Sequence, residues 1–218
     1  MTHMSLAKEI AVHRPDLGKL INHAESMPLD EADRQIVTAL VVAAKQVVER
    51  MNQIEPNLKE NRKGGVLAVG RSGFFKPFLV TEAVGEMPAP NPSAEKELDQ
   101  NKLIKYVVYV WSKLAVLVLY QSELSSGLAA AQTSVLDSQG VPKLNIDKAP
   151  IPGGAVRISH QERELLISFS GYSTGEDDEV VVLAACVLAK VLERDRALEL
   201  AVQMKNSRFL TLLPQLID

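Results

Sequence analysis

Residues 151–180 read IPGGAVRISHQERELLISFSGYSTGEDDEV, and this stretch decides the fold of the chain. Two runs rich in β-branched and apolar residues, 155–159 and 164–170, flank a polar four-residue turn, which is the pattern of an antiparallel hairpin. Thr174 follows the second run and can accept hydrogen bonds from the free amides at a helix start. Asp177 stands three residues later, as in a capping box. The stretch therefore predicts strand, turn, strand and helix in succession.

The same alternation of helix and hairpin precedes this stretch. Apolar residues recur at helical spacing after Asp30, a good helix cap, and predict a long helix: Ile36, Val37, Leu40, Val41, Ala44, Val47, Val48 and Met51. Residues 66–69 and 74–81 then read as two strands joined by a glycine-bounded loop. The sequence thus predicts a first helix followed by a first hairpin.

The region between the two hairpins predicts a second helix. Asn91 and Pro92 suit the cap and first position of a helix. Residues 106–120 contain strand-forming side chains, but they lack turn residues, so a buried helix is favoured. Residues 103–119 and 180–192 are hydrophobic nearly all round, which fits either a subunit interface or a single deep core.

The order helix, hairpin, helix, hairpin, helix indicates an α+β (α/β layered) fold, in which an antiparallel sheet of hairpins is packed by helices. Residues 30–218 form this domain in our interpretation, and residues 1–29 form an N-terminal helical appendage. Within the appendage, Leu17, Leu20 and Ile21 share one helical face after a helix start at Pro15.

Composition limits the classes of function. The chain has 218 residues, a net charge of -3 and one cysteine, so a broad basic surface for nucleic acid, an intrachain disulfide and a cysteine-based zinc site are not expected. The longest apolar stretch, 106–120, is shorter than the roughly 20 residues of a membrane-spanning helix. We therefore expect a cytoplasmic protein that contacts neither nucleic acid nor the membrane interior.

Two patterns that suggest catalysis or metal binding are incomplete. Residues 171–175 match G-x-S-x-G, but no histidine follows His160, as a hydrolase triad of that kind requires. The acidic run 176–179 lacks the alternating spacing of a calcium loop, so a solvated helix cap is favoured over a metal site. The sequence therefore predicts no catalytic residues and no metal ligands, and it leaves open whether the chain is an enzyme.

The patterned stretch resembles the GlcG/HbpS-like family, described as haem-binding or haem-degrading domains. In that family a Gly-Gly strand leads through a hairpin to a Ser-Gly loop and an acidic helix start. The matching residues here are Gly153, Gly154, Ile158, Ser170, Gly171, Thr174, Asp178 and Glu179. Val156 replaces the family's proline, and Tyr172 and Ser173 stand where glycine is usual.

The resemblance implies a profilin-like fold, a homo-oligomer and, in some members, haem or another tetrapyrrole as the ligand. It places a ligand-binding site at the loops that carry Gly153, Gly154, Ser170, Gly171, Thr174, Asp178 and Glu179, to which His160 is added as a candidate axial ligand. His13, His23 and Cys186 are the other candidates for a haem ligand.

Three hypotheses follow. In the first, the protein is a small-ligand-binding homo-oligomer of this type. In the second, it is a cofactor-free interaction or scaffold module whose appendage and apolar helices contact partners. The third, an enzyme acting on a small molecule at the same loops, lacks a defensible pair of acid and base.

Overall fold

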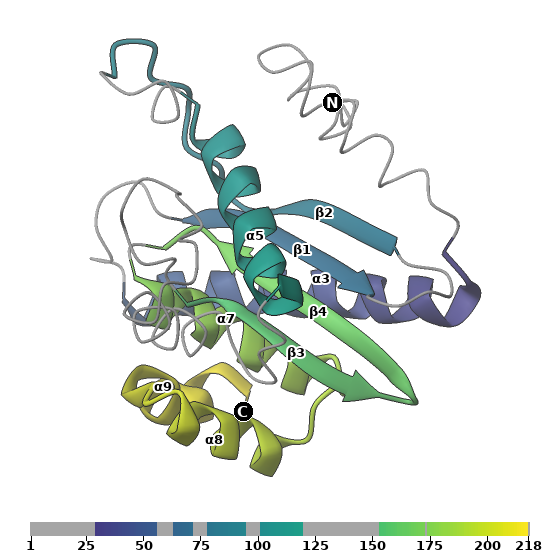
Figure 1. Ribbon diagram of the computed structural model, residues 1–218. Coiled ribbons are helices and arrows are strands. Elements are labelled where there is room, and N and C mark those ends of the chain that lie inside the picture. Colours follow the sequence, from purple (N-terminus) through teal and green to yellow (C-terminus); the bar gives the residue numbers. More distant parts are fainter. Residues whose placement is uncertain are drawn as a thin grey trace, which may run out of the picture.

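The computed structural model describes residues 29–55, 63–71, 78–94, 101–119, 153–172 and 174–217. Across these ranges four strands and five helices follow one another (Figure 1): α3 (Glu31–Ile54), β1 (Gly64–Arg71), β2 (Phe78–Gly85), α5 (Lys102–Leu119), β3 (Ala155–His160), β4 (Arg163–Ser170), α7 (Gly175–Leu188), α8 (Arg194–Gln203) and α9 (Ser207–Ile217). The expected alternation of helix and hairpin is confirmed over the described part of the chain. The appendage, apart from Leu29, lies outside the described residues.

The four strands form one antiparallel sheet in the order β2-β1-β4-β3. Each hairpin pairs with itself, and β1 then pairs with β4, so that Val66 lies opposite Ser170 and Arg71 opposite Leu165. The α+β class predicted from the sequence is therefore confirmed. The central position of β1 and β4 explains why their residues are almost all buried.

The second hairpin was predicted more accurately than the first. Gln161 and Glu162 both have positive φ, 48° and 62°, which makes the second hairpin a two-residue turn with the twist that adjacent strands require. In the first hairpin the second strand runs Phe78–Gly85, four residues later than expected, and residues 72–77 lie outside the described part.

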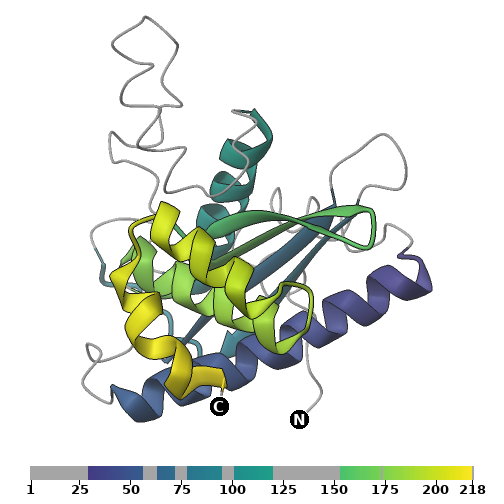
Figure 2. The ribbon, with the colours of Figure 1, turned by 90° about the horizontal axis from the view of Figure 1, so that it is seen from below.

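Helices cover both faces of the sheet (Figures 1 and 2). On one face α3 and α7 pack against the strands, and α8 and α9 follow outside α7. On the other face α5 crosses the sheet and contacts β1, β3 and β4. Side chains alternate accordingly along β1: Leu67 and Val69 join the larger core with α3 and α7, whereas Val66 and Ala68 join the core under α5.

Helix α3 begins as predicted. The Asp33 amide donates to Asp30 Oδ1 at 2.8 Å, which is the expected cap. Asp33, in the first turn, is fully buried, and its carboxylate lies 2.8 Å from Arg71 and 3.2 Å from Arg163. A buried carboxylate of this kind persists because cations pair with it.

The helix predicted over residues 106–120 is confirmed as α5. Its start lies at Asn101, whose Oδ1 accepts the amides of Leu103 and Ile104. Asn91 instead accepts the Ser93 amide in a turn, and residues 95–100 are outside the described ranges.

The last helix expected from the sequence is in fact three helices. Lys190 and Lys205 adopt left-handed backbone angles, φ 58° and 56°, after α7 and α8, so each ends a helix where no glycine marks the stop. Residues 180–186 of α7 are all fully buried within this chain, which decides for a deep core there.

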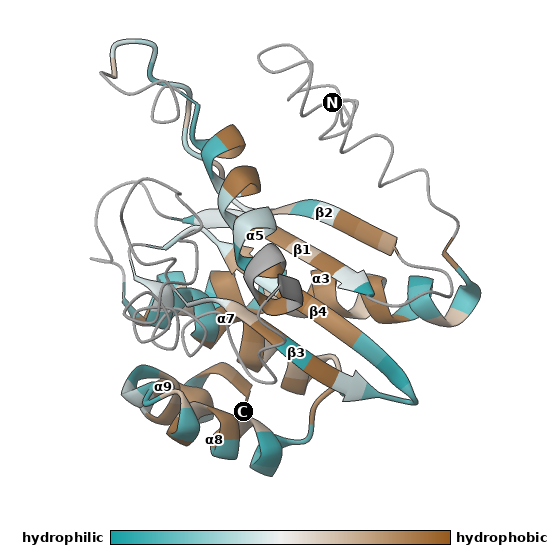
Figure 3. Cartoon of the chain, viewed as in Figure 1, coloured by the Kyte–Doolittle hydropathy of each residue, from teal (hydrophilic) through white to brown (hydrophobic). Residues whose placement is uncertain are grey.

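The hydropathy of the described elements follows this layering (Figure 3). Brown, apolar residues prevail along the strands, whereas α8 and α9 alternate brown and teal, as expected of helices with one buried side. None of the described helices is long and apolar enough to cross a bilayer.

Candidate functional site

The candidate site is the edge of the sheet at which β4 ends and α7 begins. Ser170 closes the strand, and Thr174 is the helix cap, with its Oγ1 accepting the Asp177 amide at 3.1 Å. This is the cap expected from the sequence. The cap fixes the first turn of α7, in which Asp177, Asp178 and Glu179 are buried and Glu176 is exposed.

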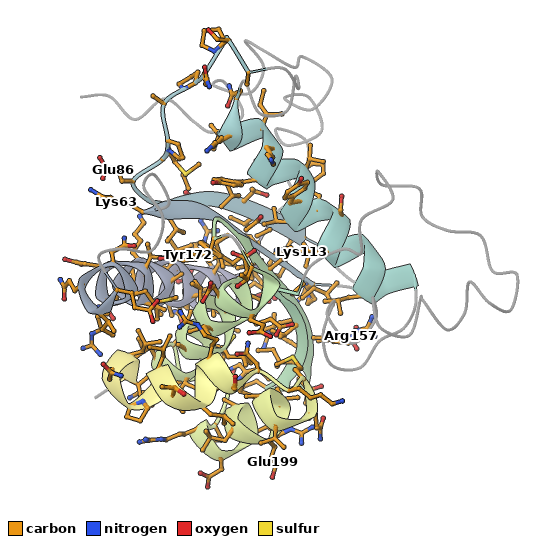
Figure 4. The ribbon with its side chains drawn as sticks, turned by 90° about the vertical axis from the view of Figure 1, so that its left-hand side faces the viewer. Lys63, Glu86, Lys113, Arg157, Tyr172 and Glu199 are labelled. Carbon is orange, nitrogen blue, oxygen red and sulfur yellow. The ribbon has the colours of Figure 1, made fainter. Side chains whose placement is uncertain are left out.

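Asp178 and Lys113 form a buried ion pair at the centre of this edge. Lys113 Nζ lies 2.7 Å from Asp178 Oδ2, and the two side chains are 0% and 3% exposed. Nζ also donates to the carbonyl of Phe169 at 2.8 Å. Figure 4 labels Lys113 on α5, the helix on the opposite face of the sheet from α7. The pair therefore links the two helical layers across the end of the sheet.

The second oxygen of the Asp178 carboxylate holds the loop after β4. Its Oδ1 accepts the amides of Gly171 and Tyr172 at 3.1 and 2.9 Å. Two backbone donors and a lysine together satisfy a carboxylate that burial would otherwise make very costly. The interpretation of residues 176–179 as a solvated cap was wrong for Asp177, Asp178 and Glu179, which are all buried, whereas Glu176 is exposed.

Gly154 is glycine because the chain passes directly over this ion pair. Its φ is +110°, and a Cβ atom there would lie 2.5 Å from Asp178 Cβ and 2.9 Å from Lys113 Nζ. Its neighbour Gly153 is equally close to Glu179, whose Oε1 would be 2.3 Å from an added Cβ. The two glycines thus permit the β3 strand to start against α7.

Glu179 is the second buried acid of the edge. It accepts a hydrogen bond from the Gly154 backbone amide and another from Asn206 Nδ2, at 3.2 Å. Asn206 is itself fully buried, donates to Glu176 O and accepts the Phe209 amide. Glu179 therefore connects the start of β3 to the turn between α8 and α9.

Burial dominates the electrostatics of both acids. It raises the pKa of Asp178, against the opposing effect of Lys113 and the two amides. It raises the pKa of Glu179 to about 7, with Asn206, the Gly154 amide and Lys113 acting in the other direction. Glu179 therefore exchanges its proton near neutral pH.

A more exposed cluster lies beside the cap. Arg208 reaches both oxygens of Glu55 at 2.9 and 2.7 Å and also donates to Asp177 Oδ1 at 3.0 Å. Tyr172 donates to Asn52 Oδ1 at 3.3 Å, and burial raises the pKa of its hydroxyl. These contacts attach the end of α3 and the start of α9 to the start of α7.

The structure brings together seven of the eight residues predicted to bind a ligand. Gly153, Gly154, Ser170, Gly171, Thr174, Asp178 and Glu179 all lie at this edge. His160 does not, because it pairs with Arg163 at the far end of the hairpin, five residues along β3 from Ala155. At about 3.3 Å per residue, that separation is roughly 16 Å. Ser173, the serine of the hydrolase-like pattern, lies outside the described residues.

Lys113, Asn206 and Arg208 complete the edge and were missed by sequence reasoning. Of these three, only Lys113 is indicated by the sequence. It is a charged residue inside an apolar helical run, where burial requires a partner of opposite charge. Within the described residues no group of three or more histidine, cysteine, aspartate and glutamate side chains is arranged to hold a metal ion. The chemistry of the edge is that of a neutralised, hydrogen-bonded junction.

Comparison of the chain with protein-family models, with curated proteins and with solved structures gave no match.

Proposed function

We propose that this chain is a cofactor-free protein-interaction module whose first partner is a second copy of itself. The observation that carries the proposal is the unequal covering of the sheet: in the described part of the chain, α5 alone lies over one face, and five apolar side chains around it stay partly exposed. They are Leu79, Met87, Leu103, Val108 and Trp111. A partly exposed apolar surface of this kind marks an association site.

The distribution of charge on α5 favours a symmetric partner. Its charged residues are Lys102 and Lys105 near the start and Lys113, which forms the buried ion pair with Asp178. Two copies of α5 packed antiparallel about a two-fold axis would hold Lys102 and Lys105, both half-buried within one chain, at opposite ends. Such an isologous arrangement joins apolar surfaces without bringing like charges together.

The loops support the cofactor-free part of the proposal. The groups that the family resemblance assigns to a ligand are engaged within the chain: Asp178 by Lys113 and two amides, and Glu179 by Asn206 and the Gly154 amide. The space over the glycines is filled by these same acids. A ligand at this edge would have to displace buried contacts.

Binding of a small ligand, with haem or another tetrapyrrole as the first to try, is the second candidate. The convergence of two glycines, a serine and two buried acids at one sheet edge favours it. That the chain has the profilin-like fold of the GlcG/HbpS-like family is likewise a proposal, and it is based on the resemblance alone.

One experiment separates the two. The mass of the purified chain is measured by light scattering while haemin is added and the absorption spectrum recorded. We expect twice 23.8 kDa and no saturable Soret shift. Val108→Glu should give a monomer, whereas Val202→Glu, at a 62% exposed position of α8, should leave the dimer intact.

Two results would overturn the proposal. A wild-type monomer at micromolar concentration would remove the self-association. A saturable Soret band that survives His160→Ala and is lost in Asp178→Asn would make the loops a ligand site instead.

A further inference from the structure

Two glycines, Gly153 and Gly154, form a cover over the buried charged groups at the sheet edge. A Cβ atom on Gly153 would lie 2.3 Å from Glu179 Oε1, and one on Gly154 would lie 2.9 Å from Lys113 Nζ. Gly153 is half-buried, whereas Glu179 behind it is 3% exposed. The backbone of this glycine cover therefore lies directly on both charged groups.

The glycine cover is held by few contacts. It leads into β3, which is an edge strand of the sheet and has only β4 as a neighbour. The Gly154 carbonyl accepts the Phe169 amide of β4 at 2.8 Å, and the Gly154 amide donates to Glu179. The amide of the cover thus depends on the Glu179 carboxyl group for its hydrogen bond.

The buried charges at this edge do not balance when both acids are ionised. Asp178 and Glu179 are both buried, and the one buried cation beside them, Lys113, lies 2.7 Å from Asp178. Glu179 receives its hydrogen bonds from two neutral donors, Asn206 Nδ2 and the Gly154 amide. An ionised Glu179 is therefore a second buried negative charge that shares one cation, which is costly.

Other charged groups do not remove this imbalance. Lys113 of α5 favours the ionised form of Glu179, but Glu176, on the same helix as Glu179, opposes it. Arg208, at the start of α9, pairs with Glu55 of α3 at 2.7 Å. Burial is the largest effect and raises the pKa of Glu179 to about 7, in agreement with the charge balance.

We propose that Glu179 controls the glycine cover by its protonation: the cover is closed over Lys113 and Asp178 while Glu179 is protonated, and loss of the proton opens it. Opening exposes the carboxylate to water, which removes the cost of a buried charge. It also gives water or a small solute access to the ion pair without unfolding of the helices. The proposal does not depend on self-association through α5.

Of the two contacts of Glu179, the one with the glycine cover is the weaker. Asn206 is fully buried, and besides Glu179 it binds the carbonyl of Glu176 and the amide of Phe209. Gly154 is joined to the sheet at the strand edge alone. The opening is therefore expected at the start of β3 and not at the turn between α8 and α9.

Amide hydrogen exchange of the full chain, followed by NMR between pH 5 and 8, tests this. Each rate is divided by the intrinsic rate at that pH to give a protection factor. The amides of Gly154 and Phe169 report the glycine cover, and the amide of Phe209 reports the turn. The amide of Leu183, a fully buried residue in the middle of α7, reports global unfolding.

We expect Gly154 and Phe169 to be at least about tenfold less protected than Leu183 and Phe209, because local opening needs less free energy than global unfolding. The protection factor of Gly154 should fall by about tenfold for each pH unit between pH 5 and 6.5 and level off above about 7.5. The sign follows from the raised pKa, since the closed state holds a proton that the open state releases.

Glu179→Gln should abolish this dependence on pH, because an amide does not ionise. Glu199→Gln is the matched control, since Glu199 is a 61% exposed side chain of α8, well away from Lys113 in Figure 4. The control should keep the wild-type dependence. The carbon-13 shift of the Glu179 carboxyl group should titrate with a midpoint near pH 7 in wild type.

Four results would overturn the proposal. Equal protection of Gly154 and Leu183 would mean that the cover opens only by global unfolding. Low protection at Phe209 in place of Gly154 would assign the opening to the turn. A dependence on pH that persists in Glu179→Gln would assign it to another group, and a Glu179 midpoint near its ordinary value of 4.5 would remove the imbalance of charge.

Discussion

Lys113 and Asp178, 65 residues apart in the chain, meet at 2.7 Å in the interior and join the two helical layers of the molecule. Lys113 comes from α5 on one face of the sheet and Asp178 from α7 on the other. A buried pair of this kind costs both charges their hydration, and it is stable only because the Phe169 carbonyl and two amides complete the hydrogen bonding.

Breaking this pair on one side should be strongly destabilising. We expect Lys113→Met to lower the free energy of unfolding by about 3 to 5 kcal/mol at pH 7, because Asp178 is left buried without its cation. The double variant Lys113→Met with Asp178→Asn should recover part of the loss, because the side-chain amide carries no charge and its oxygen still accepts the amides of Gly171 and Tyr172. Urea unfolding followed by circular dichroism measures both, and a loss in the double variant equal to the sum of the single losses would contradict the pairing.

The same single variant should become more stable in acid. Burial already raises the pKa of Asp178 above its ordinary value, and removal of Lys113 raises it further. The folded variant then binds a proton that the unfolded chain has released. Its free energy of unfolding should therefore increase as the pH falls from 7 to 5, more steeply than in wild type. The prediction would be contradicted if the free energy of unfolding changed equally with pH in Lys113→Met and in wild type.

Glu179 should make stability depend on pH below neutrality. Its pKa is about 7 in the folded chain against an ordinary value of 4.5, so between these values only the folded state holds the proton. The free energy of unfolding should fall as pH rises through this window, by at most about 3 kcal/mol at ~1.4 kcal/mol for each pH unit.

Glu179→Gln isolates this contribution. The amide cannot ionise, so the slope between pH 4.5 and 7 should flatten. One amide hydrogen of the glutamine would face a donor, either Asn206 or the Gly154 amide, which lowers stability by about 1 kcal/mol at every pH without changing the slope. An unchanged slope would assign the titration to another group.

Gly154→Ala should destabilise the chain by about 3 kcal/mol. Its φ of +110° strains any residue with a side chain, and the new methyl group would meet Asp178 and Lys113. Gly70→Ala is the matched control, since it lies in β1 without positive φ and its nearest atom would be 3.1 Å away. Similar losses of thermal stability in the two variants would contradict the close packing at Gly154.

Arg208→Ala should cost about 1 kcal/mol. The guanidinium reaches both oxygens of Glu55, but it is 33% exposed, so solvent screens much of the attraction. Arg208→Lys should recover less than half, because an ammonium cannot make the forked contact. The difference between wild type and Arg208→Ala should shrink in roughly 1 M salt. A loss that does not respond to salt would indicate packing by the side chain instead.

Parts of the candidate site that depend on local contacts could be predicted from the sequence, and parts that join distant segments could not. The Thr174 cap and the hairpin from Ala155 to Ser170 depend on neighbours within a few residues, and both were predicted. His160 was added to the loops as a candidate axial ligand, but an extended strand carries it to the other end of the sheet. Asn206 and Arg208 join the site through α9, and no local pattern indicates that.

The sequence alone determined the local structure of this protein: the amphipathic periodicity of α3, the two hairpins, the α+β class and the helix cap at Thr174 all follow from residue spacing. Only the tertiary structure decided which segments meet. The pairing of β1 with β4, the burial of Asp33 beside Arg71 and Arg163, and the contact of Lys113 with Asp178 depend on that packing. The physical reason is that a local pattern shows at most that a charged side chain needs a partner, as at Lys113, whereas the partner itself comes from another part of the chain.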